Sequence, residues 1–253
     1  PCRSGTIVDV IRHVAPEYSI FWEADGRAGE TKASEALYGR KTLPAYDIAS
    51  AHYLVSFGAD VLSSFSGSWG ESEYAQARAG TDGVITRFAY VGPHRGLTGA
   101  NADDWLDCRP GSEAGLAMAM AKLVATATHY SGPANEWLAG VDVDASCAAA
   151  GVDKAKLEAA AARFAQGKSL AVPSNDMDPH AVDIAKATFL LNEVSGNKEP
   201  LFHLDGYTGP MSDHADLMDL AEAMENGKIG VLLLDDGVDP VHALGAGSDR
   251  FLA

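Results

Sequence analysis

The sequence predicts an α/β fold with a mainly parallel sheet, and three observations support this prediction. Short apolar segments rich in branched and aromatic residues alternate with helical segments, in the order strand, turn, helix, strand. The strand segments are apolar at consecutive positions, as expected when helices cover both faces of a sheet. Several of these segments end in a turn that contains glycine, proline or aspartate.

The first half of the chain contains four of the predicted strands. Apolar residues at helical spacing predict a helix over 6–14, and an aromatic and branched run predicts a strand over 18–22. A short helix over 31–38 follows and is ended by Gly39. The later elements are a strand over 53–57, a helix over 70–78, strands over 87–91 and 105–108, and a long helix that Ser112 caps and that runs to about residue 126.

The second half begins with an alanine-rich helical region and ends with a short apolar run. The last of its elements, 229–234, is predicted to be a buried strand that leads into Asp235–Pro240. A strand followed by a turn rich in glycine and aspartate also occurs at 53–60, so we interpret the two as related ligand-facing edges. The elements before the last strand are helices over 133–165, a strand over 169–172, a helix over 180–194, a loop over 201–211 and a helix over 214–225.

The change of character near residue 130 predicts two portions, 1–130 and 131–253. The chain starts abruptly at Pro1 and stops at Ala253, shortly after a strand-like run. We therefore expect both ends to be cuts through a larger protein, with the second portion truncated.

Composition excludes several classes of function. The formal charge is −16, which argues against binding nucleic acid or an anionic membrane surface. No run approaches the ~18 apolar residues of a transmembrane helix, so we expect no direct membrane insertion. The three cysteines lie far apart, so we expect no iron–sulfur cluster and no cysteine-ligated zinc within this chain.

Three turns at predicted strand ends form the candidate binding site. Ligands of an open parallel sheet bind at the carboxyl ends of its strands, where glycine turns and helix N-termini accommodate phosphate. Arg95 and Arg109 supply charge-assisted donors, and Glu113 supplies an acceptor for a base or ribose. The open alternatives are that the turns are only structural and that Arg109 pairs with Asp107 or Glu113. The candidate residues are Gly58, Ala59, Asp60, Gly92, Pro93, His94, Arg95, Arg109, Gly111, Ser112 and Glu113.

Other catalytic and metal-binding patterns are weak. His180, His203 and His214 have acidic neighbours in the sequence, but their spacing matches no metal motif, and solvated surface pairs are the favoured interpretation. No G-x-S-x-G motif is present. We therefore assign neither a catalytic residue nor a metal ligand.

Three stretches resemble motifs of the molybdopterin oxidoreductase family, the superfamily of dimethyl-sulfoxide reductase, formate dehydrogenase and polysulfide reductase. The resemblance is strongest to the branch with the molybdoenzyme-like subunit of alternative complex III and the large subunits of menaquinone reductases. The stretches are TLPAYDIASAHYLVSFGAD (42–60), YVGPHRGLTGANADDWLDCRPGSEAGLAMAMAKLV (90–124) and GVLLLDDGVDPVHAL (230–244).

The resemblance implies Rossmann-like layers of the formate dehydrogenase and dimethyl-sulfoxide reductase type around molybdenum bis(molybdopterin guanine dinucleotide). Residues 1–130 would be the Rossmann-like domain that faces the dinucleotide. The candidate turns would face one guanine dinucleotide, with Glu113 recognising guanine. Asp239 and Pro240, in the loop over 235–240, would face the other.

The implied function is that of a fragment of an oxidoreductase large subunit that takes part in electron transfer. Its implied partners are an iron–sulfur electron-transfer subunit and a membrane quinone-reactive subunit of a respiratory complex, on the periplasmic side of the membrane. The parent protein would carry an iron–sulfur cluster.

The sequence also departs from the family pattern. Gly92 replaces an acidic residue, Asp239 replaces an asparagine, and neither the four-cysteine segment nor a metal ligand is present. These departures leave an alternative open, a cofactor-less scaffold subunit of a membrane-bound quinol-oxidising complex.

Overall fold

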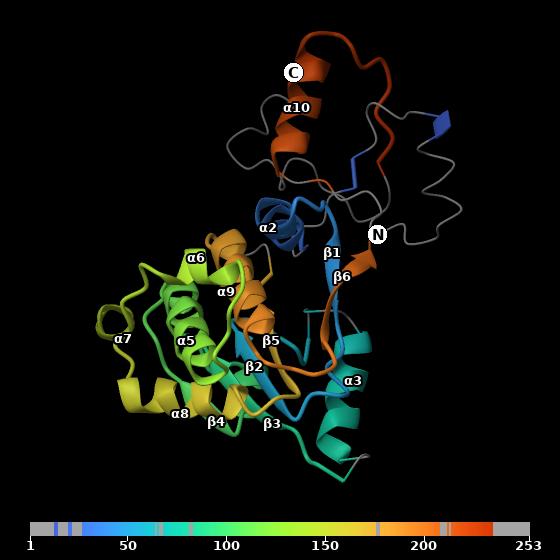
Figure 1. Ribbon diagram of the computed structural model, residues 1–253. Helices are drawn as coiled ribbons and strands as arrows, with labels where there is room; N and C mark the ends of the chain where they lie inside the picture. The colour runs from blue at the N-terminus through green and yellow to red at the C-terminus, as the bar shows by residue number, and fades with distance from the viewer. Residues whose placement is uncertain are drawn as a thin grey trace. The chain divides into compact units, whose positions relative to one another are not determined.

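The computed structural model describes residues 13–14, 20–21, 27–63, 65, 68–80, 83–175, 178–207, 212 and 214–234 (Figure 1). Most of the predicted helix over 6–14, most of the predicted strand over 18–22, and the loop Asp235–Pro240 lie outside the described residues. The chain separates into two compact units. One comprises Gly29–Thr208, and the other comprises Pro1–Ala28 with Gly209–Ala253.

A parallel sheet is the centre of the Gly29–Thr208 unit. Its four described strands lie in the order β4-β3-β2-β5, and every neighbouring pair is parallel. In the register of the sheet, Val55 lies opposite both Ala89 and Ala171. This confirms the predicted fold class. The strands are β2 (Tyr53–Phe57), β3 (Arg87–Val91), β4 (Asp104–Leu106) and β5 (Ser169–Pro173).

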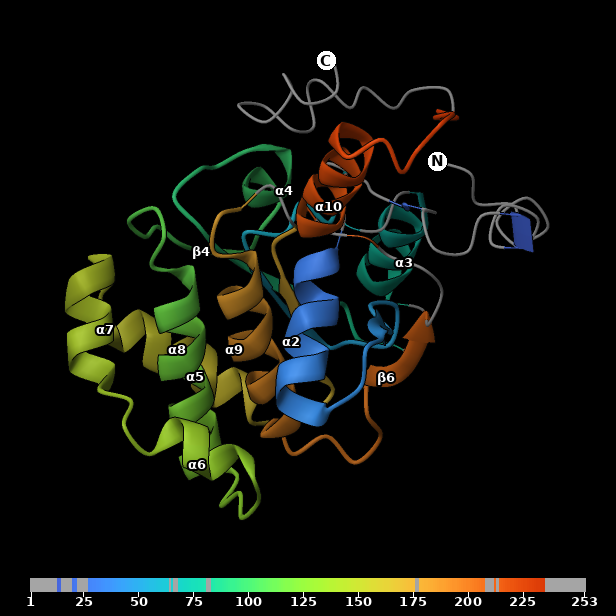
Figure 2. The same ribbon diagram turned by 90° about the horizontal axis from the view of Figure 1, so that it is seen from above.

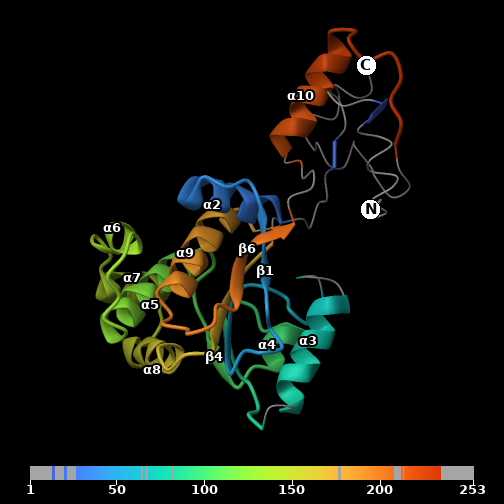
Figure 3. The same cartoon turned by 45° about the vertical axis from the view of Figure 1, so that its right-hand side comes forward.

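Helices cover both faces of this sheet, with α3 on one side and α5, α8 and α9 on the other (Figure 3). Alternate residues of β2 divide between two apolar cores: Val55 and Phe57 pack under α5, α8 and α9, and Leu54 packs in the core on the side of α3. Figure 2 shows α9 between α5 and α2, and Ala33 of α2 packs against Ala185 and Phe189 of α9. The helices are α2 (Ala28–Tyr38), α3 (Ser68–Ala79), α4 (Leu97–Ala100), α5 (Glu113–Ala127), α8 (Lys154–Phe164) and α9 (Ala181–Glu193).

The predicted helical region over 133–165 consists of three helices, α6 (Ala134–Leu138), α7 (Val143–Ala150) and α8. The Asp142 side chain caps α7 by accepting a hydrogen bond from the amide of Ala145 (3.0 Å), and Asp153 caps α8 in the same way.

The sheet contains strands from both predicted portions of the chain: β5 comes from the second portion, and it lies beside β2 from the first. The domain division into 1–130 and 131–253 stays a prediction.

The prediction of a loop over 201–211 is wrong for its first part. Residues Phe202–Tyr207 form the strand β6, which pairs antiparallel with the short strand β1 (Leu43–Tyr46). The glycine and aspartate of this segment are typical of a turn, but tertiary contacts override that local preference. The Phe202 ring packs against the Phe189 ring of α9 in a tilted arrangement, with an interplanar angle of 41° and a centroid separation of 4.9 Å. A Cβ atom on Gly206 would lie only 2.3 Å from the carbonyl oxygen of Leu43, so the strand pairing itself requires glycine.

The buried strand predicted over 229–234 is also wrong. These residues follow α10 (His214–Glu225) as irregular chain, and the side chains of Val231 and Leu233 are 77% and 90% exposed. A strand needs a neighbouring backbone to satisfy its hydrogen bonds, and none of the described residues pairs with this run. Apolar composition alone therefore gave the wrong structure here.

Two asparagines occupy the outer edge of β5, where a further strand would pair. The Asn192 amide accepts from the N–H of Ala171 and donates to its carbonyl, both at 2.8 Å. Asn197 makes the same pair of bonds with Ser169, at 3.1 and 2.8 Å. The two side chains thus satisfy an edge that would otherwise be open to another strand.

We expect Asn192→Ala to destabilise the Gly29–Thr208 unit by about 2–4 kcal/mol, because it leaves a buried N–H and a buried carbonyl of Ala171 without partners. Urea unfolding followed by circular dichroism measures the loss. Asn197→Ala is the matched control: its bonds are only partly buried, so water replaces them and the loss is smaller. Equal losses for the two variants would contradict this account of the edge.

Candidate functional site

The carboxyl edge of the sheet contains the point where strand order reverses. The chain proceeds from β2 through β3 to β4 in one direction, whereas β5 lies on the other side of β2. Ligands of open α/β sheets bind in the crevice beside such a reversal. Gly58 and Ser174, the residues that follow β2 and β5, meet there, and a Cβ on Gly58 would lie 3.3 Å from that of Ser174. Gly58 has φ +78°, a conformation that side chains disfavour.

Asp60 organises the turn after β2. Its carboxylate accepts a hydrogen bond from the hydroxyl of Thr98, at the second residue of α4. Its carbonyl oxygen accepts from the amides of Ser63 and Phe65, both at 3.1 Å. The Ser56 hydroxyl donates to the carbonyl of Ala59 at 2.7 Å. The polar groups of this turn are therefore used to hold its own conformation.

The turn after β3 is packed around Tyr90. The indole N–H of Trp105 donates to the Gly92 carbonyl at 3.0 Å, and the Arg95 guanidinium lies 5.3 Å from the centroid of the Trp105 ring. A Cβ on Gly92 would lie 3.0 Å from the Tyr90 ring. An acidic side chain at this position would therefore require the Tyr90 ring to shift slightly. Pro93 and His94, the other predicted site residues here, are exposed.

The Arg109 guanidinium is bonded to backbone rather than to an acid. Its Nη1 donates to the carbonyls of Ala149 (2.8 Å) and Ala148 (3.3 Å), at the end of α7 where the helix dipole favours a cation. The alternative that Arg109 forms an ion pair with Asp107 or Glu113 is therefore wrong. The Ser112 hydroxyl donates to the Arg109 carbonyl, so its side chain does not cap α5 as predicted.

Glu113 is a buried carboxylate at the first residue of α5. It is 3% exposed, and its Oε2 has no hydrogen-bond partner among the described residues. Burial raises the pKa of Glu113, and the nearby Asp178 raises it further, whereas the backbone amide of Gly111 lowers it. A buried acceptor without a partner is uncommon in a folded protein and indicates a missing donor.

The structure adds residues that follow β5 to this edge, and sequence analysis missed them as site residues. The Ser174 hydroxyl is buried and has no partner among the described residues. His180 lies beside Gly111, whose Cβ would be 3.1 Å from the His180 Nε2. The sequence did contain a signal for them: 169–172 was predicted to be a strand, so the residues after its carboxyl end could have been included in the candidate site. We call 58–60, 92–95, 109–113, Ser174 and His180 together the strand-end site.

Comparisons with known proteins agree with the resemblance inferred from the motifs. No family model matches the chain. Over 109 residues it is 30% identical to the menaquinone reductase, molybdopterin-binding-like subunit of Nitratidesulfovibrio vulgaris strain Hildenborough, a stretch that covers 41% of this chain and 15% of that protein. The fold matches acetylene hydratase from Pelobacter acetylenicus with a TM-score of 0.53 and 16% identity, over 70% of this chain and 25% of that one. The resemblance to the molybdopterin oxidoreductase family is confirmed.

The structural match bears on the fold alone, because the identity to acetylene hydratase is only 16%. It agrees with the predicted α/β fold of parallel strands with flanking helices. The chain spans only a small part of either relative's length.

No group of three histidine, cysteine or acidic side chains that could hold a metal ion occurs among the described residues. No helix in the described ranges combines the length and the apolar character that crossing a bilayer requires.

The resemblance implies a guanine dinucleotide at the strand-end site, and the residues there can be compared with the chemistry of that group. The unpartnered Oε2 of Glu113 fits the base, because guanine presents N–H donors that a carboxylate accepts. The site offers no carboxylate at position 92 for a ribose. Asp239 and Pro240, predicted to face a second dinucleotide, lie outside the described residues. The residues present therefore fit the guanine end of the cofactor.

We expect Glu113→Gln to leave the protein at least as stable as the wild type at pH 7. The folded-state pKa of Glu113 lies above its unfolded value, so the ionised carboxylate opposes folding at neutral pH. This cost is lost as the pH falls below 4.5, where the group is protonated in both states. Urea unfolding at several pH values measures the difference, with the exposed Glu35→Gln as control. A glutamine variant that is clearly less stable at pH 7 would refute the assignment of a buried, poorly solvated carboxylate.

Proposed function

We propose that this chain is part of the large subunit of a molybdopterin-type oxidoreductase, and that its strand-end site binds the guanine end of a pterin guanine dinucleotide. The observation that supports this most directly is the buried Oε2 of Glu113, which lacks a partner among the described residues at the edge of the sheet where ligands bind. The likeness to a molybdopterin-binding-like subunit supports the class of cofactor.

Guanine carries a ring N–H next to an exocyclic amino group, and one carboxylate accepts from both. Adenine lacks this pair of adjacent donors, so an unpaired acceptor discriminates between the two bases. Burial of Glu113 excludes competing water and keeps the carboxylate fixed at the helix N-terminus. The bound molybdenum cofactor would supply the redox chemistry, and this chain's residues would bind and orient its nucleotide.

The name of the curated relative, a menaquinone reductase subunit, supports a place in a multi-subunit respiratory complex. We propose an iron–sulfur electron-transfer subunit and a membrane quinone-reactive subunit as partners, on the periplasmic side of the membrane. The electron-transfer role and the guanine dinucleotide form of the cofactor are parts of this same proposal.

A second candidate, a cofactor-less scaffold subunit of a quinol-oxidising complex, is favoured by two other observations. A side chain at Gly92, such as a ribose-binding acid, would crowd the Tyr90 ring, which lies 3.0 Å from the Cβ position. The Arg109 guanidinium, expected to bind phosphate, already donates to two carbonyls at the end of α7. Under this hypothesis the strand-end site would keep the shape of a nucleotide site without holding a nucleotide.

Titration calorimetry with guanosine diphosphate and adenosine diphosphate distinguishes the two functions. We expect the wild type to prefer the guanine nucleotide, and Glu113→Gln to weaken its binding by about 1.5–3 kcal/mol while adenine nucleotide binding stays unchanged. Glutamine would place one N–H donor against the donors of guanine. The matched control is Glu35→Gln, on the exposed surface of α2. No preference for guanine in the wild type would reject the cofactor-binding proposal and leave the scaffold.

A further inference from the structure

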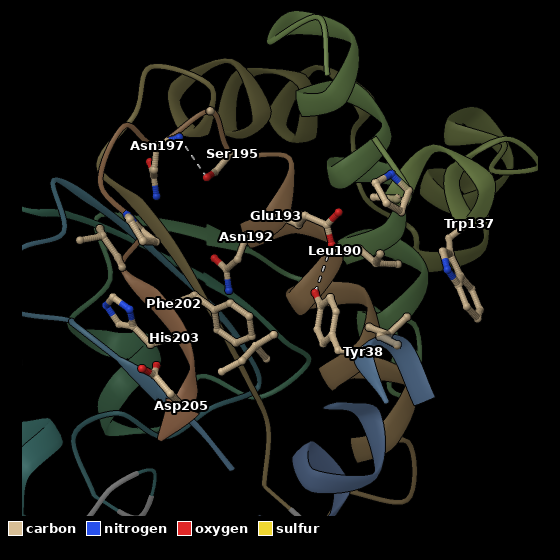
Figure 4. A pocket seen from close by; sticks show the side chains of 17 residues that line it. Tyr38, Trp137, Leu190, Asn192, Glu193, Ser195, Asn197, Phe202, His203 and Asp205 are labelled. Atoms are coloured by element: carbon tan, nitrogen blue, oxygen red, sulfur yellow. Dashed lines mark hydrogen bonds between the residues drawn. The ribbon is translucent and has the colours of Figure 1, made fainter. Parts of the chain in front are cut away.

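A groove of about 590 Å³ lies in the Gly29–Thr208 unit, away from the strand-end site (Figure 4). It is lined by the end of α2, by α6, by the end of α9 and by β6. Asn197, one of its lining residues, is bonded to Ser169, the first residue of β5. The groove is therefore at the amino end of that strand, whereas the strand-end site is at the carboxyl end.

The charged side chains of the groove are acidic. Glu193 and Asp205 line it, together with His203, and its lining contains no lysine or arginine among the described residues. Asp205 is exposed and has neither a hydrogen bond nor an ion pair through its side chain with the described part of the chain. The formal charge of −16 for the whole chain adds to the negative potential at this surface. The groove is thus complementary to a cation.

The Glu193 carboxylate is held in place by two phenols. Tyr38 donates to its Oε2 at 3.2 Å, and Tyr130 donates to its Oε1. Burial, and then the neighbouring Glu193, raise the pKa of Tyr38, so the phenol stays a proton donor at neutral pH. Each carboxylate oxygen has a further lone pair to offer. Two protein donors therefore orient the carboxylate without occupying all its acceptor sites.

Trp137 of α6 supplies an aromatic surface on one side of the groove. Its side chain is 52% exposed, and it lines the groove with Leu37 and Leu190. A guanidinium stacks favourably on an indole, and exposed tryptophans are enriched where proteins bind other proteins. Figure 4 shows Trp137 on one side, Asp205 on the other, and Glu193 between them.

We propose that this groove binds a basic segment of a partner protein, with one arginine stacked on Trp137 beside Glu193 and a second basic side chain at Asp205. A segment fits better than a compact cation because the groove is open and its two acids come from different elements, α9 and β6. The proposal does not depend on nucleotide binding at the strand-end site.

The test is a titration with a blocked peptide that contains two arginines, observed by NMR at the indole N–H of Trp137. Trp137→Phe assigns that signal among the four tryptophans. The same peptide with citrulline in place of both arginines is the neutral probe of equal shape. We expect the arginine peptide to shift the Trp137 signal and to bind about tenfold more tightly than the citrulline peptide.

Variants locate the binding surface. Asp205→Asn and Glu193→Gln are each expected to weaken the arginine peptide about threefold to tenfold, and Asp205→Asn keeps the test valid if the glutamine variant fails to fold. Glu158→Gln, an equal change of charge on α8, is expected to leave the affinity unchanged. Equal affinity for the two peptides, wild-type affinity in Asp205→Asn, or no shift of the Trp137 signal would each overturn the proposal.

Discussion

The hydrogen bonding of β2 on both sides determines where everything else in the Gly29–Thr208 unit lies. Each of its five residues is buried and pairs with β3 on one side and β5 on the other. Because β5 arrives from much later in the chain, strand order reverses at β2, and ligands of open α/β sheets bind beside such a reversal. The alternating side chains of the same strand anchor the cores under α3 and under α5, α8 and α9. The position of the strand-end site follows from this one strand.

The polar groups at the outer edge of β5 differ from those at the carboxyl edge of the sheet in whether they have hydrogen-bond partners. On the outer edge of β5, the side chains of Asn192 and Asn197 bond the backbone groups of Ala171 and Ser169 that a further strand would bond. The carboxyl edge instead retains buried oxygens on Glu113 and Ser174 that have no partners among the described residues. An unsatisfied buried acceptor costs about 1–3 kcal/mol. A ligand that brings its own donors would recover that cost.

The sequence predicted the parts of the fold that depend on local pattern. The strands over 53–57 and 87–91 were predicted with the bounds that the structure shows, because their apolar runs are buried on both faces. β6 and the run over 229–234 were mispredicted for one shared reason: strand formation depends on a partner that is remote in the sequence. β6 has one in β1 despite its turn-like composition, and 229–234 has none among the described residues despite its apolar composition.

The candidate site likewise has a part that the sequence predicted and a part that depends on tertiary contacts. The rule that ligands meet strand ends placed Glu113 at the edge without any knowledge of its surroundings. It did not reveal that the Arg109 guanidinium bonds to α7, because α7 begins more than thirty residues later in the chain. Nor did it indicate that the Tyr90 ring lies close to Gly92, which only the packed structure shows. Side-chain partners, unlike strand ends, are set by tertiary contacts.

The acidity of the chain has a consequence for both binding proposals. A protein with a formal charge of −16 gains little from long-range attraction to a diphosphate, and Arg109 of the strand-end site already donates within the chain. Under the proposed function, recognition at that site relies on the neutral donors of a base, which the unpartnered Oε2 of Glu113 accepts. At the groove beside Trp137 the same acidity is favourable, because the proposed occupant is a cation. The two ends of the sheet are thus suited to ligands of different charge. In both proposals a carboxylate accepts hydrogen bonds from the ligand: Glu113 at the strand-end site, and Glu193 and Asp205 at the groove.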